Sequence, residues 1–395
     1  MKNIVIVDCI RTGLAKAHRG TFNLTRSDDL VAHCIDALLD RNRQVDPASI
    51  EDVIIGCGRQ VGEQSANMAR HAVACSQLPI TVPATTISRA CSSGLNAIAF
   101  AANQINSGCA EIMMAGGVES ITGLSRGTAG TFAENPKLVA AMPDIFMAMG
   151  NTAEVVARRY QVTREAQDAY ALQSQQRYAA AAEAGLIAEE IAPMSVQWQA
   201  VVDKTTQDTQ ITNGVVDHDE CNRPSTTLDG LASLGPAFEE GGSVTAGNAS
   251  QLSDGAAMTL LMTEKKAEQL GLNPMGYFRG FTVAGCEPDE MGIGPVFAIP
   301  KLLQYASLTL ADIDLVELNE AFASQCLYCR DALGIDNEIY NVNGGSIAIG
   351  HPFGMTGARM TGALLRELKR RNNKYGIVSM CIGKGMGAAG LFEAI

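Results

Sequence analysis

Apolar residues recur along the chain in short runs that alternate with stretches of helical spacing. The runs Ile4–Val7, Val53–Ile55, Ile112–Met114, Leu315–Leu318 and Ile377–Met380 predict buried β-strands. Strands that alternate with helices are typical of α/β proteins, and we expect a sheet with mostly parallel strands.

The clearest helical pattern covers Ser27–Asn42. Ser27 is suited to cap this helix, and Asp28 and Asp29 fit its first turn, where acidic groups favour the helix dipole. Apolar side chains at three- and four-residue spacing form the face that we expect to be buried: Leu30, Val31, Cys34, Ile35 and Leu38. A pair of helices is also predicted between Asn151 and Glu183.

Two parts of the chain share the same order of patterns. Residues 49–55 resemble residues 311–317, and a helix over 91–106 with its following strand resembles a helix over 356–371 with its strand. This order predicts an internal duplication. The polar, Gly- and Ala-rich region 121–243 lies between the two parts, and we interpret it as an insertion on the first.

Composition narrows the classes of protein. The 395 residues are 47% apolar and 18% charged, with a formal net charge of −12, which argues against a nucleic-acid-binding surface. No membrane span is visible, and the first residues predict a buried strand instead of a signal peptide. Eleven cysteines, an odd number, indicate free thiols in a reducing compartment, so we expect a cytoplasmic protein.

Cys91 follows the strand-like segment Thr85–Ile87 and precedes a helix of small residues. A thiol at the start of a helix lies among unpaired backbone N–H groups at the positive end of the dipole, which stabilises a thiolate. A small cysteine buried in the core fits this segment equally well, so the segment alone leaves both interpretations open.

His351 is one of five histidines, and glycines and a proline surround it in Gly350-His351-Pro352-Phe353-Gly354. Such a loop has a sterically restricted backbone, which a histidine of the core seldom requires. We therefore predict a functional role. A histidine within reach of a thiol is the usual activator of a cysteine nucleophile.

Cys381 and Gly383 belong to a glycine-rich segment, 381–387, directly after a predicted strand. Its glycines resemble a dinucleotide-binding fingerprint, but we expect no such site, because the residues up to Ile395 leave no room for a βαβ unit and its acidic residue. We expect a backbone packed tightly against a reacting group instead, with N–H donors available to an oxyanion.

Asn319 follows another predicted strand and offers a carboxamide, although a helix cap explains it equally well. Cys326 and Cys329 have the spacing of a redox or metal pair. They lie inside a predicted helix without a second pair, so we interpret them as core cysteines and do not predict zinc.

Taken together, these segments resemble the thiolase family, and the resemblance covers essentially the whole chain in the order of the family's motifs. The matching segments are 8–13, 88–97, Gly116–Ser120, Val244–Ser250 and those around Asn319, His351 and Cys381. The resemblance implies a five-layered α/β/α/β/α fold with two duplicated halves, residues 1–120 plus 244–268 and residues 269–395. It also implies an inserted loop domain, 121–243, that contacts CoA and acyl groups, and a homodimer or homotetramer.

The resemblance implies roles by position. Cys91 matches the nucleophile that takes the acyl group from an acyl-CoA, and His351 matches its activating base and a donor to the thioester oxygen. Cys381 matches the second acid/base, which moves the proton on the acetyl methyl carbon. Asn319 matches the residue that holds a water in one oxyanion hole, and the N–H groups of Cys91 and Gly383 match the other hole. No metal or redox cofactor is implied, and coenzyme A takes part as a substrate.

Substrate contacts are implied for five further residues: Ser250, Ala249, Arg223, Met149 and Phe322. For Arg223, a solvated loop arginine is an equally good interpretation. Lys384 departs from the pattern, because the family usually has glycine there and lysine disfavours a positive φ. We expect the three neighbouring glycines, Gly383, Gly385 and Gly387, to preserve activity.

The implied enzyme is an acyltransferase of fatty-acid β-oxidation, an acetyl-CoA C-acyltransferase that converts 3-ketoacyl-CoA and CoA into acyl-CoA and acetyl-CoA. Its mechanism is ping-pong, through a thioester on Cys91. The alternative is an acetyl-CoA C-acetyltransferase restricted to acetoacetyl-CoA, whose members commonly have histidine where Ala148 stands.

Two other classes fit less well. A ketoacyl synthase would need histidine or asparagine in place of Cys381, and a non-catalytic lipid-binding module would not need both cysteines and His351. Chain-length preference, direction of flux, dimer or tetramer, and a fatty-acid oxidation complex as partner stay open.

Overall fold

The computed structural model of the chain describes residues 3–126, 134–203, 205 and 207–395. Its strands are β1 (Ile4–Arg11), β2 (Ala15–Lys16), β3 (Asp52–Cys57), β4 (Ala84–Ile87), β5 (Ile112–Glu119), β6 (Met194–Val201), β7 (Thr209–Val216), β8 (Ser253–Thr263), β9 (Gly276–Gly285), β10 (Leu315–Leu318), β11 (Tyr375–Ile382) and β12 (Met386–Ala394). All five runs predicted as strands lie in such elements, namely β1, β3, β5, β10 and β11.

The helices confirm the predicted helical segments. They are α1 (Ser27–Arg41), α2 (Met68–Cys75), α3 (Ser93–Ser107), α4 (Pro136–Ala141), α5 (Met149–Arg159), α6 (Arg164–Glu183), α7 (Leu228–Ala232), α8 (Glu264–Gln269), α9 (Gly294–Ala306), α10 (Ala323–Leu333), α11 (Ser346–Ile349) and α12 (Thr356–Arg371). The proposed cap of the first helix is wrong. Arg26 occupies the cap position, and Ser27 is buried, with its backbone N–H donating to Glu63.

The main sheet has the order β10-β11-β12-β9-β1-β8-β5-β3-β4, with β2 paired to β8. The prediction of mostly parallel strands is wrong: among the described strands, the parallel pairs are β3–β4, β3–β5 and β10–β11, and the other pairs are antiparallel. Parallel neighbours need a long crossover. The three-residue turn between β11 and β12 allows antiparallel pairing alone, which apolar runs do not reveal.

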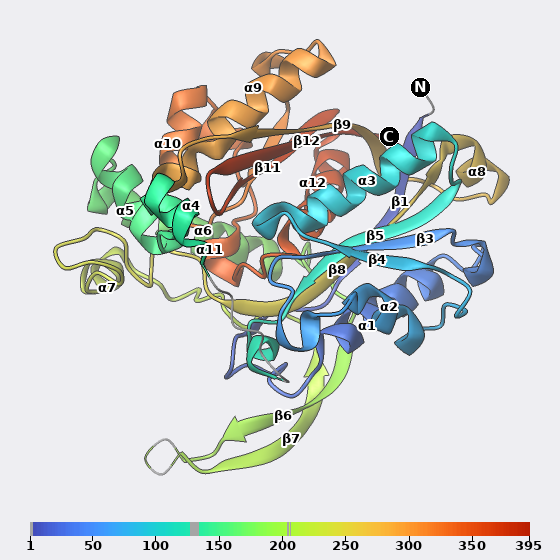
Figure 1. Ribbon diagram of the computed structural model, residues 1–395, viewed down its shortest axis with the longest axis horizontal. Helices are drawn as coiled ribbons and strands as arrows, with labels where there is room; N and C mark the ends of the chain where they lie inside the picture. The colour runs from blue at the N-terminus through green and yellow to red at the C-terminus, as the bar shows by residue number, and fades with distance from the viewer. Residues whose placement is uncertain (1–2, 127–133, 204, 206) are drawn as a thin grey trace.

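Five layers result, as expected from the family resemblance (Figure 1). Helices α1 and α2 cover the outer face of β1, β8, β5, β3 and β4, and α9 with α10 beside it covers the far face of β9, β12, β11 and β10. Helices α3 and α12 fill the layer between the two groups of strands. The short pairing of Val5 with Tyr277 and Ile6 with Gly276 joins both groups into one sheet.

The strand order confirms the duplication. The series β3-β5-β8-β1 and β10-β11-β12-β9 have the same succession of one parallel and two antiparallel pairs. Helices α3 and α12 are therefore equivalent elements of the two halves, and both belong to the central layer.

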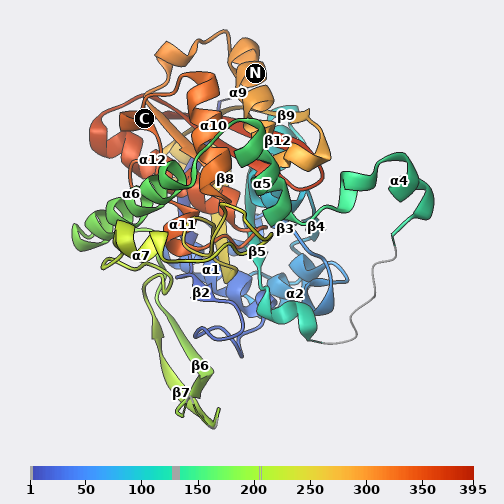
Figure 2. The same ribbon diagram turned by 90° about the vertical axis from the view of Figure 1, so that its left-hand side faces the viewer.

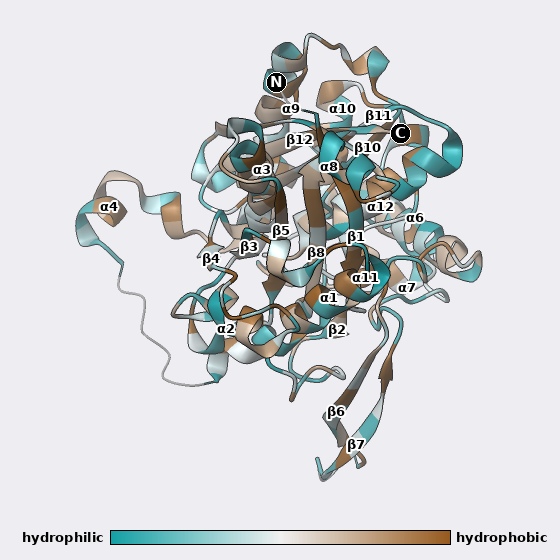
Figure 3. Ribbon diagram, turned by 90° about the vertical axis from the view of Figure 1, so that its right-hand side faces the viewer, coloured by the Kyte–Doolittle hydropathy of each residue, from teal (hydrophilic) through white to brown (hydrophobic). Residues whose placement is uncertain are grey.

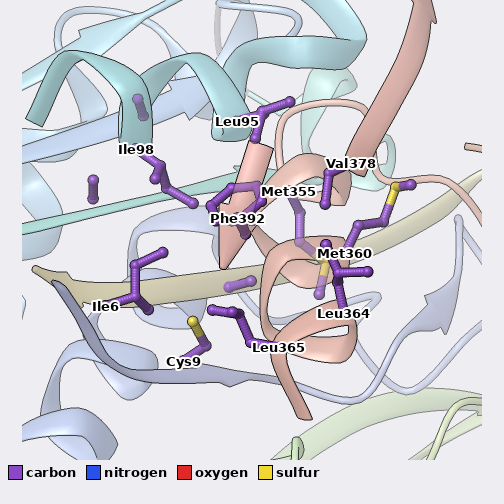
Figure 4. Packing of buried hydrophobic residues seen from close by; sticks show 14 of the residues in the cluster. Ile6, Cys9, Leu95, Ile98, Met355, Met360, Leu364, Leu365, Val378 and Phe392 are labelled. Carbon is purple, nitrogen blue, oxygen red and sulfur yellow. The ribbon is translucent and has the colours of Figure 1, made fainter. Parts of the chain in front are cut away.

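The contact between the two central helices is apolar. Leu95 and Ile98 of α3 pack with Leu364 of α12 and Phe392 of β12, and all four side chains are buried (Figure 4). Strands β1, β5 and β8 are correspondingly hydrophobic, whereas α8 at the surface is polar (Figure 3). Burial of this apolar surface therefore holds α3 and α12 against each other, next to the site described below.

Two segments project from the layered body, the β6–β7 hairpin and the segment that carries α4 (Figure 2). Within the described residues, no helix is both long and apolar enough to cross a membrane.

Candidate active site

Cys91 lies in a short 3-10 turn, Ala90–Ser92, directly before α3. The buried Ser93 side chain braces this turn, because its hydroxyl accepts from the Arg89 N–H at 2.9 Å and donates to the Ala90 carbonyl at 2.6 Å. Ala90 has a φ of +43°, which is unusual for a residue with a side chain. The turn therefore holds the thiol in a defined place at the start of the helix.

Burial governs the thiol's ionisation. It raises the pKa of Cys91 to about 11, although a hydrogen bond from the Gly383 N–H favours the thiolate, and the nearby Glu119 carboxylate raises the pKa further. The expected thiolate at the helix N-terminus is therefore not the resting state, because desolvation outweighs the helix dipole. If this thiol is to act as a nucleophile, a base must take its proton.

His351 lies at the equivalent place in the other half, in the loop before α12. The ring is buried, and burial, followed by the charge of Arg359, lowers its pKa to about 3, so it is a neutral imidazole. Phe353 connects it to the thiol: its ring lies edge-on, 5.1 Å from the His351 ring, and it shares an apolar cluster with Cys91.

Polar side chains hold both nitrogens of the His351 ring. Asn319 Nδ2 lies 3.2 Å from Nε2, and Thr356 Oγ1 lies 2.6 Å from Nδ1. The Asn319 amide is itself fixed, since Ser346 Oγ donates to its Oδ1 at 2.6 Å. The structure thus brings together Asn319 and His351, two residues that the sequence singled out separately.

Cys381 is fully buried near the end of β11, and its thiol lies 3.7 Å from Gln325 Oε1. Burial, and after it the proximity of Cys91, raises its pKa well above the ordinary value. The two thiols therefore lie within electrostatic reach of each other, and Gly383, two residues further on, presents its N–H to Cys91.

The turn between β11 and β12 contains two residues with left-handed backbone. Lys384 has a φ of +72° and Gly385 a φ of +83°. A Cβ at position 385 would lie 2.2 Å from the Cys286 carbonyl oxygen, so glycine is required there. Lys384 therefore has the positive φ that we expected lysine to disfavour. Its side chain lies over Phe146, with Nζ 5.1 Å from the centre of the ring.

Glu119, at the end of β5, connects the loops around the site. Its carboxylate accepts from the N–H groups of Gly58, Arg59 and Gly354 and from Gln64 Nε2, at 2.8–3.1 Å. Burial nevertheless raises its pKa to about 7. Because Gly354 follows His351 closely, Glu119 fastens the histidine loop to the half that carries Cys91.

Three of the five residues implied in substrate binding line two neighbouring cavities. Arg223 is exposed on the wall of a cavity of about 270 Å³. Ala249 and Ser250 line a cavity of about 410 Å³. Ala246 and Gln251 line both cavities, which are therefore adjacent, and we refer to the two together as the groove.

Met149 and Phe322 lie closer to the thiols. The Met149 sulfur is 4.0 Å from the place that a Cβ on Gly383 would occupy. Phe322 belongs to the apolar cluster that contains Cys381 and Ala249, and its ring packs edge-on against Phe238 of the groove. Packed apolar side chains therefore connect the wall of the groove to Cys381.

Sequence reasoning missed several residues of this site, among them Glu119, Thr356, Ser346 and Gln325. Glu119 contacts Gly354 and Gln325 contacts Cys381 across 235 and 56 positions, and patterns within short windows do not show such contacts. Thr356 lies only five positions after His351, and Ser346 lies 27 positions after Asn319, but hydroxyl residues are too common for their sequence alone to indicate a partner. Within the described part of the chain, no group of three or more His, Cys, Asp or Glu side chains could hold a metal ion.

Comparisons with known proteins agree with this geometry. Residues 4–265 match the family described as thiolase, N-terminal domain, and residues 272–394 match thiolase, C-terminal domain. A 3-ketoacyl-CoA thiolase of Bacillus subtilis (strain 168) is 48% identical over 394 residues, which cover 100% of both chains.

Solved structures are similar over their full length. The acetyl-CoA acetyltransferase of Bacillus anthracis has 38% sequence identity and a TM-score of 0.88, with 100% of this chain and 99% of that chain covered. The dimeric peroxisomal thiolase of Saccharomyces cerevisiae has 37% identity and a TM-score of 0.90, with 100% and 98% covered. The chain therefore belongs to the thiolase family, and it is an acyltransferase.

Proposed function

We propose that the chain catalyses the thiolytic cleavage of 3-ketoacyl-CoA to acetyl-CoA and a shortened acyl-CoA by a ping-pong mechanism. The observation that carries this proposal is the convergence of two buried thiols and a neutral histidine, with the Gly383 N–H beside Cys91. Names of relatives such as the Bacillus subtilis 3-ketoacyl-CoA thiolase support the substrate class.

The first half-reaction transfers the acyl group to the enzyme. His351 Nε2 takes the proton of Cys91, and the thiolate attacks the ketone carbon of the substrate. The carbon–carbon bond then breaks, and its electron pair moves into an enolate that Cys381 protonates to give acetyl-CoA. Donors such as the N–H groups of Gly383 and Cys91 stabilise the developing oxyanion, at ~3 kcal/mol for one donor.

The second half-reaction restores the enzyme. The Cys381 thiolate takes the proton of free CoA, and the CoA thiolate attacks the acyl group on Cys91. Cys91 leaves as a thiolate and recovers its proton from the His351 imidazolium. Protons and electrons balance over the two halves.

The groove formed by the two cavities is the proposed path of coenzyme A. Besides Arg223, the side chains of Lys16, His18 and Arg19 line it, and these suit a phosphorylated ligand. This assignment retains residues 121–243 as the inserted domain that contacts CoA, of which 127–133, 204 and 206 lie outside the described residues. Arg223→Ala should raise the KM for CoA without lowering kcat, whereas exposed Arg43→Ala should change neither.

The test of the reaction separates its two halves. After incubation with acetyl-CoA, intact mass should show an acetyl adduct on the wild type and on Cys381→Ala, but none on Cys91→Ala. Cys381→Ala should lose carbon–carbon bond cleavage by at least ~100-fold, because the enolate then has no acid beside it to protonate its carbon. An acetyl adduct on Cys91→Ala would refute the assignment of the nucleophile.

Substrate scope and assembly belong to the same proposal. The restriction to acetoacetyl-CoA is the alternative, which the similar acetyl-CoA acetyltransferase of Bacillus anthracis keeps open. We also propose a homodimer, because Phe100, Phe297 and Tyr305 are 44–58% exposed on α3 and α9 and the Saccharomyces cerevisiae neighbour is dimeric. Sedimentation at micromolar concentration distinguishes monomer, dimer and tetramer.

The cytoplasm is the proposed compartment, since all eleven cysteines are free thiols. Cell fractionation tests this location.

A further inference from the structure

A chain of hydrogen bonds runs through the His351 ring from Ser346 at the start of α11 to Thr356 at the start of α12. It begins at Ser346 Oγ, passes to Asn319 Oδ1, continues from Asn319 Nδ2 to His351 Nε2, and leaves the ring at Nδ1 toward Thr356 Oγ1. Thr356 Oγ1 then contacts the Pro352 carbonyl oxygen at 2.9 Å. All side chains of this chain are buried, so each proton in it needs a partner.

The Ser346 end gives the direction of the chain. Within the described residues, Asn319 Oδ1 is the one hydrogen-bond partner of Ser346 Oγ, and the serine is fully buried. Its single proton must therefore go to the amide oxygen. The amide NH2 group then faces the ring, and it donates to Nε2, which carries a lone pair.

The Thr356 end gives the same direction independently. The hydroxyl has one proton, and its bond to the Pro352 carbonyl uses it, because a carbonyl oxygen only accepts. Thr356 Oγ1 thus turns a lone pair toward Nδ1 at 2.6 Å. The proton of the neutral imidazole accordingly lies on Nδ1.

We propose that Thr356 is a positioning residue, which holds His351 in the tautomer with its proton on Nδ1. Nε2 then stays unprotonated, and its lone pair, which receives the Asn319 amide N–H at rest, can turn to the proton of Cys91. This inference rests on the proposed function, in which His351 is the base for Cys91. A chain in the opposite direction would place the proton on Nε2, and that nitrogen could not accept another. When His351 becomes an imidazolium, Thr356 also stabilises the charge by accepting from Nδ1–H.

The same helix offers a matched control. Thr361 of α12 is fully buried, and its hydroxyl also donates to the carbonyl four residues earlier, that of Gly357, at 2.9 Å. Thr356→Val and Thr361→Val therefore remove the same kind of hydroxyl from the same helix. Only the first also removes an acceptor for the histidine.

The primary measurement is the rate at which Cys91 becomes acetylated by acetyl-CoA, followed by rapid quenching and intact mass. Thr356→Val should slow this rate ~10–100-fold, the usual effect of losing a partner that orients a histidine. Thr356→Ser, which keeps the hydroxyl, and Thr361→Val should stay within about threefold of wild type. Equal rates for Thr356→Val and Thr361→Val would overturn the proposal.

A second measurement does not depend on the threonine variants. Nitrogen-15 NMR of histidine-labelled wild type, with five histidines to assign through His351→Gln, should show His351 protonated on Nδ1 and not on Nε2. A proton on Nε2 would refute the tautomer even if every threonine variant misfolds. His351→Ala separates this inference from the proposed function. If His351→Ala becomes acetylated at the wild-type rate, His351 is not the base and the proposed function is wrong on this point. If His351→Ala is inactive but Thr356→Val is fully active, only the positioning role of Thr356 is refuted.

Discussion

At the scale of single residues, burial decides how the reactive groups are charged at rest. It raises the pKa of Cys91 to about 11 and lowers that of His351 to about 3, so the neutral pair is favoured over thiolate and imidazolium. In the proposed mechanism, charge then develops only when a substrate oxygen can accept it near the Gly383 N–H. The site is in this respect prepared for the transition state and not for the resting enzyme.

Glu317 allows a test of burial by pH. Burial raises its pKa to about 8 from an ordinary 4.5, against the charge of Arg359 and with further contributions from Glu320, Glu190 and Arg177. The folded state therefore holds this proton more tightly than the unfolded state. The protonated Glu317 contributes fully to stability below pH 4.5, and this contribution is lost as pH rises toward 8. The loss amounts to ~1.4 kcal/mol per pH unit.

Glu317→Gln should remove that loss. Urea unfolding from about pH 6 to about pH 9, on both sides of that pKa, should show the free energy of unfolding falling more steeply with pH in wild type than in Glu317→Gln. The exposed Glu338→Gln serves as control and should keep the wild-type slope. Parallel slopes for wild type and Glu317→Gln would contradict the buried, protonated carboxyl.

Single residues also show the limit of sequence reasoning. His351 stands out in the sequence, because glycines and a proline surround it, whereas the segment around Cys91 left a core cysteine equally possible and the family resemblance singled it out. Glu119 could not, since its carboxylate binds Gly354, which is 235 positions away. Only the folded chain shows such a contact.

At the scale of elements, the β11–β12 turn requires glycine at position 385 but tolerates a lysine at position 384. Lys384→Gly should relieve a positive φ worth ~1 kcal/mol, partly offset by the greater freedom of glycine in the unfolded chain. We expect turnover within about tenfold, or ~1.4 kcal/mol of barrier. Gly385→Ala should instead lower both stability and turnover, because its Cβ would collide with the Cys286 carbonyl. Thermal unfolding and thiolysis rates measure both; a change of several orders of magnitude in Lys384→Gly would show that the lysine sets the oxyanion loop.

The start of α5 offers a test of acyl-chain preference. Ala148 is the exposed cap residue of this helix, and the next residue, Met149, approaches Gly383. A small side chain here should leave room for longer acyl groups, at up to ~0.8 kcal/mol per buried methylene. We expect kcat/KM to rise from acetoacetyl-CoA to longer 3-ketoacyl-CoA substrates in wild type, and Ala148→His to reverse that order. A wild-type profile that is highest for acetoacetyl-CoA would favour the acetyl-CoA C-acetyltransferase.

Elements differ in how far the sequence reveals them. The helix Thr356–Arg371 could be predicted with both ends correct, because its apolar face is regular and its last turn is basic. Strands β8, β9 and β12 were not predicted, and without them the direction of the strands could not be inferred. β12 in particular is rich in glycine and alanine, which are weak indicators of a strand.

At the scale of the whole molecule, the duplication explains why the site lies where it does. Cys91 precedes α3 and His351 precedes α12, so equivalent ends of two equivalent helices each contribute one reactive group. The His351 loop packs directly on the other half: a Cβ on Gly117 would lie 1.9 Å from the Gly354 carbonyl oxygen. Neither half of the chain by itself contains both Cys91 and His351.

A buried ion pair fastens the region 121–243 to strand β1 of the main sheet. Arg11 of β1 contacts Glu190 at 2.9 Å and Asp219 at 2.7 and 2.9 Å, and all three side chains are buried. Burial alone would raise the pKa of Asp219, but Arg11 holds it below the ordinary value. The residues between Glu190 and Asp219 include the projecting β6–β7 hairpin, so this contact fixes the base of the hairpin.

Arg11→Met keeps the length of the side chain but leaves two buried carboxylates without their partner. We expect a loss of ~3–5 kcal/mol of stability near neutral pH. Without Arg11, burial raises the pKa of Asp219, so the folded variant should hold a proton there and lose stability as pH rises. Urea unfolding should therefore show a smaller deficit in acid than at neutral pH. Arg41→Met is the matched control, because the Arg41 side chain is 43% exposed beside Asp8 and should contribute no more than about 1 kcal/mol. If both variants lose the same stability, the inserted region does not depend on the buried pair, and its attachment must come from the apolar contacts around Ile191 and Ala192.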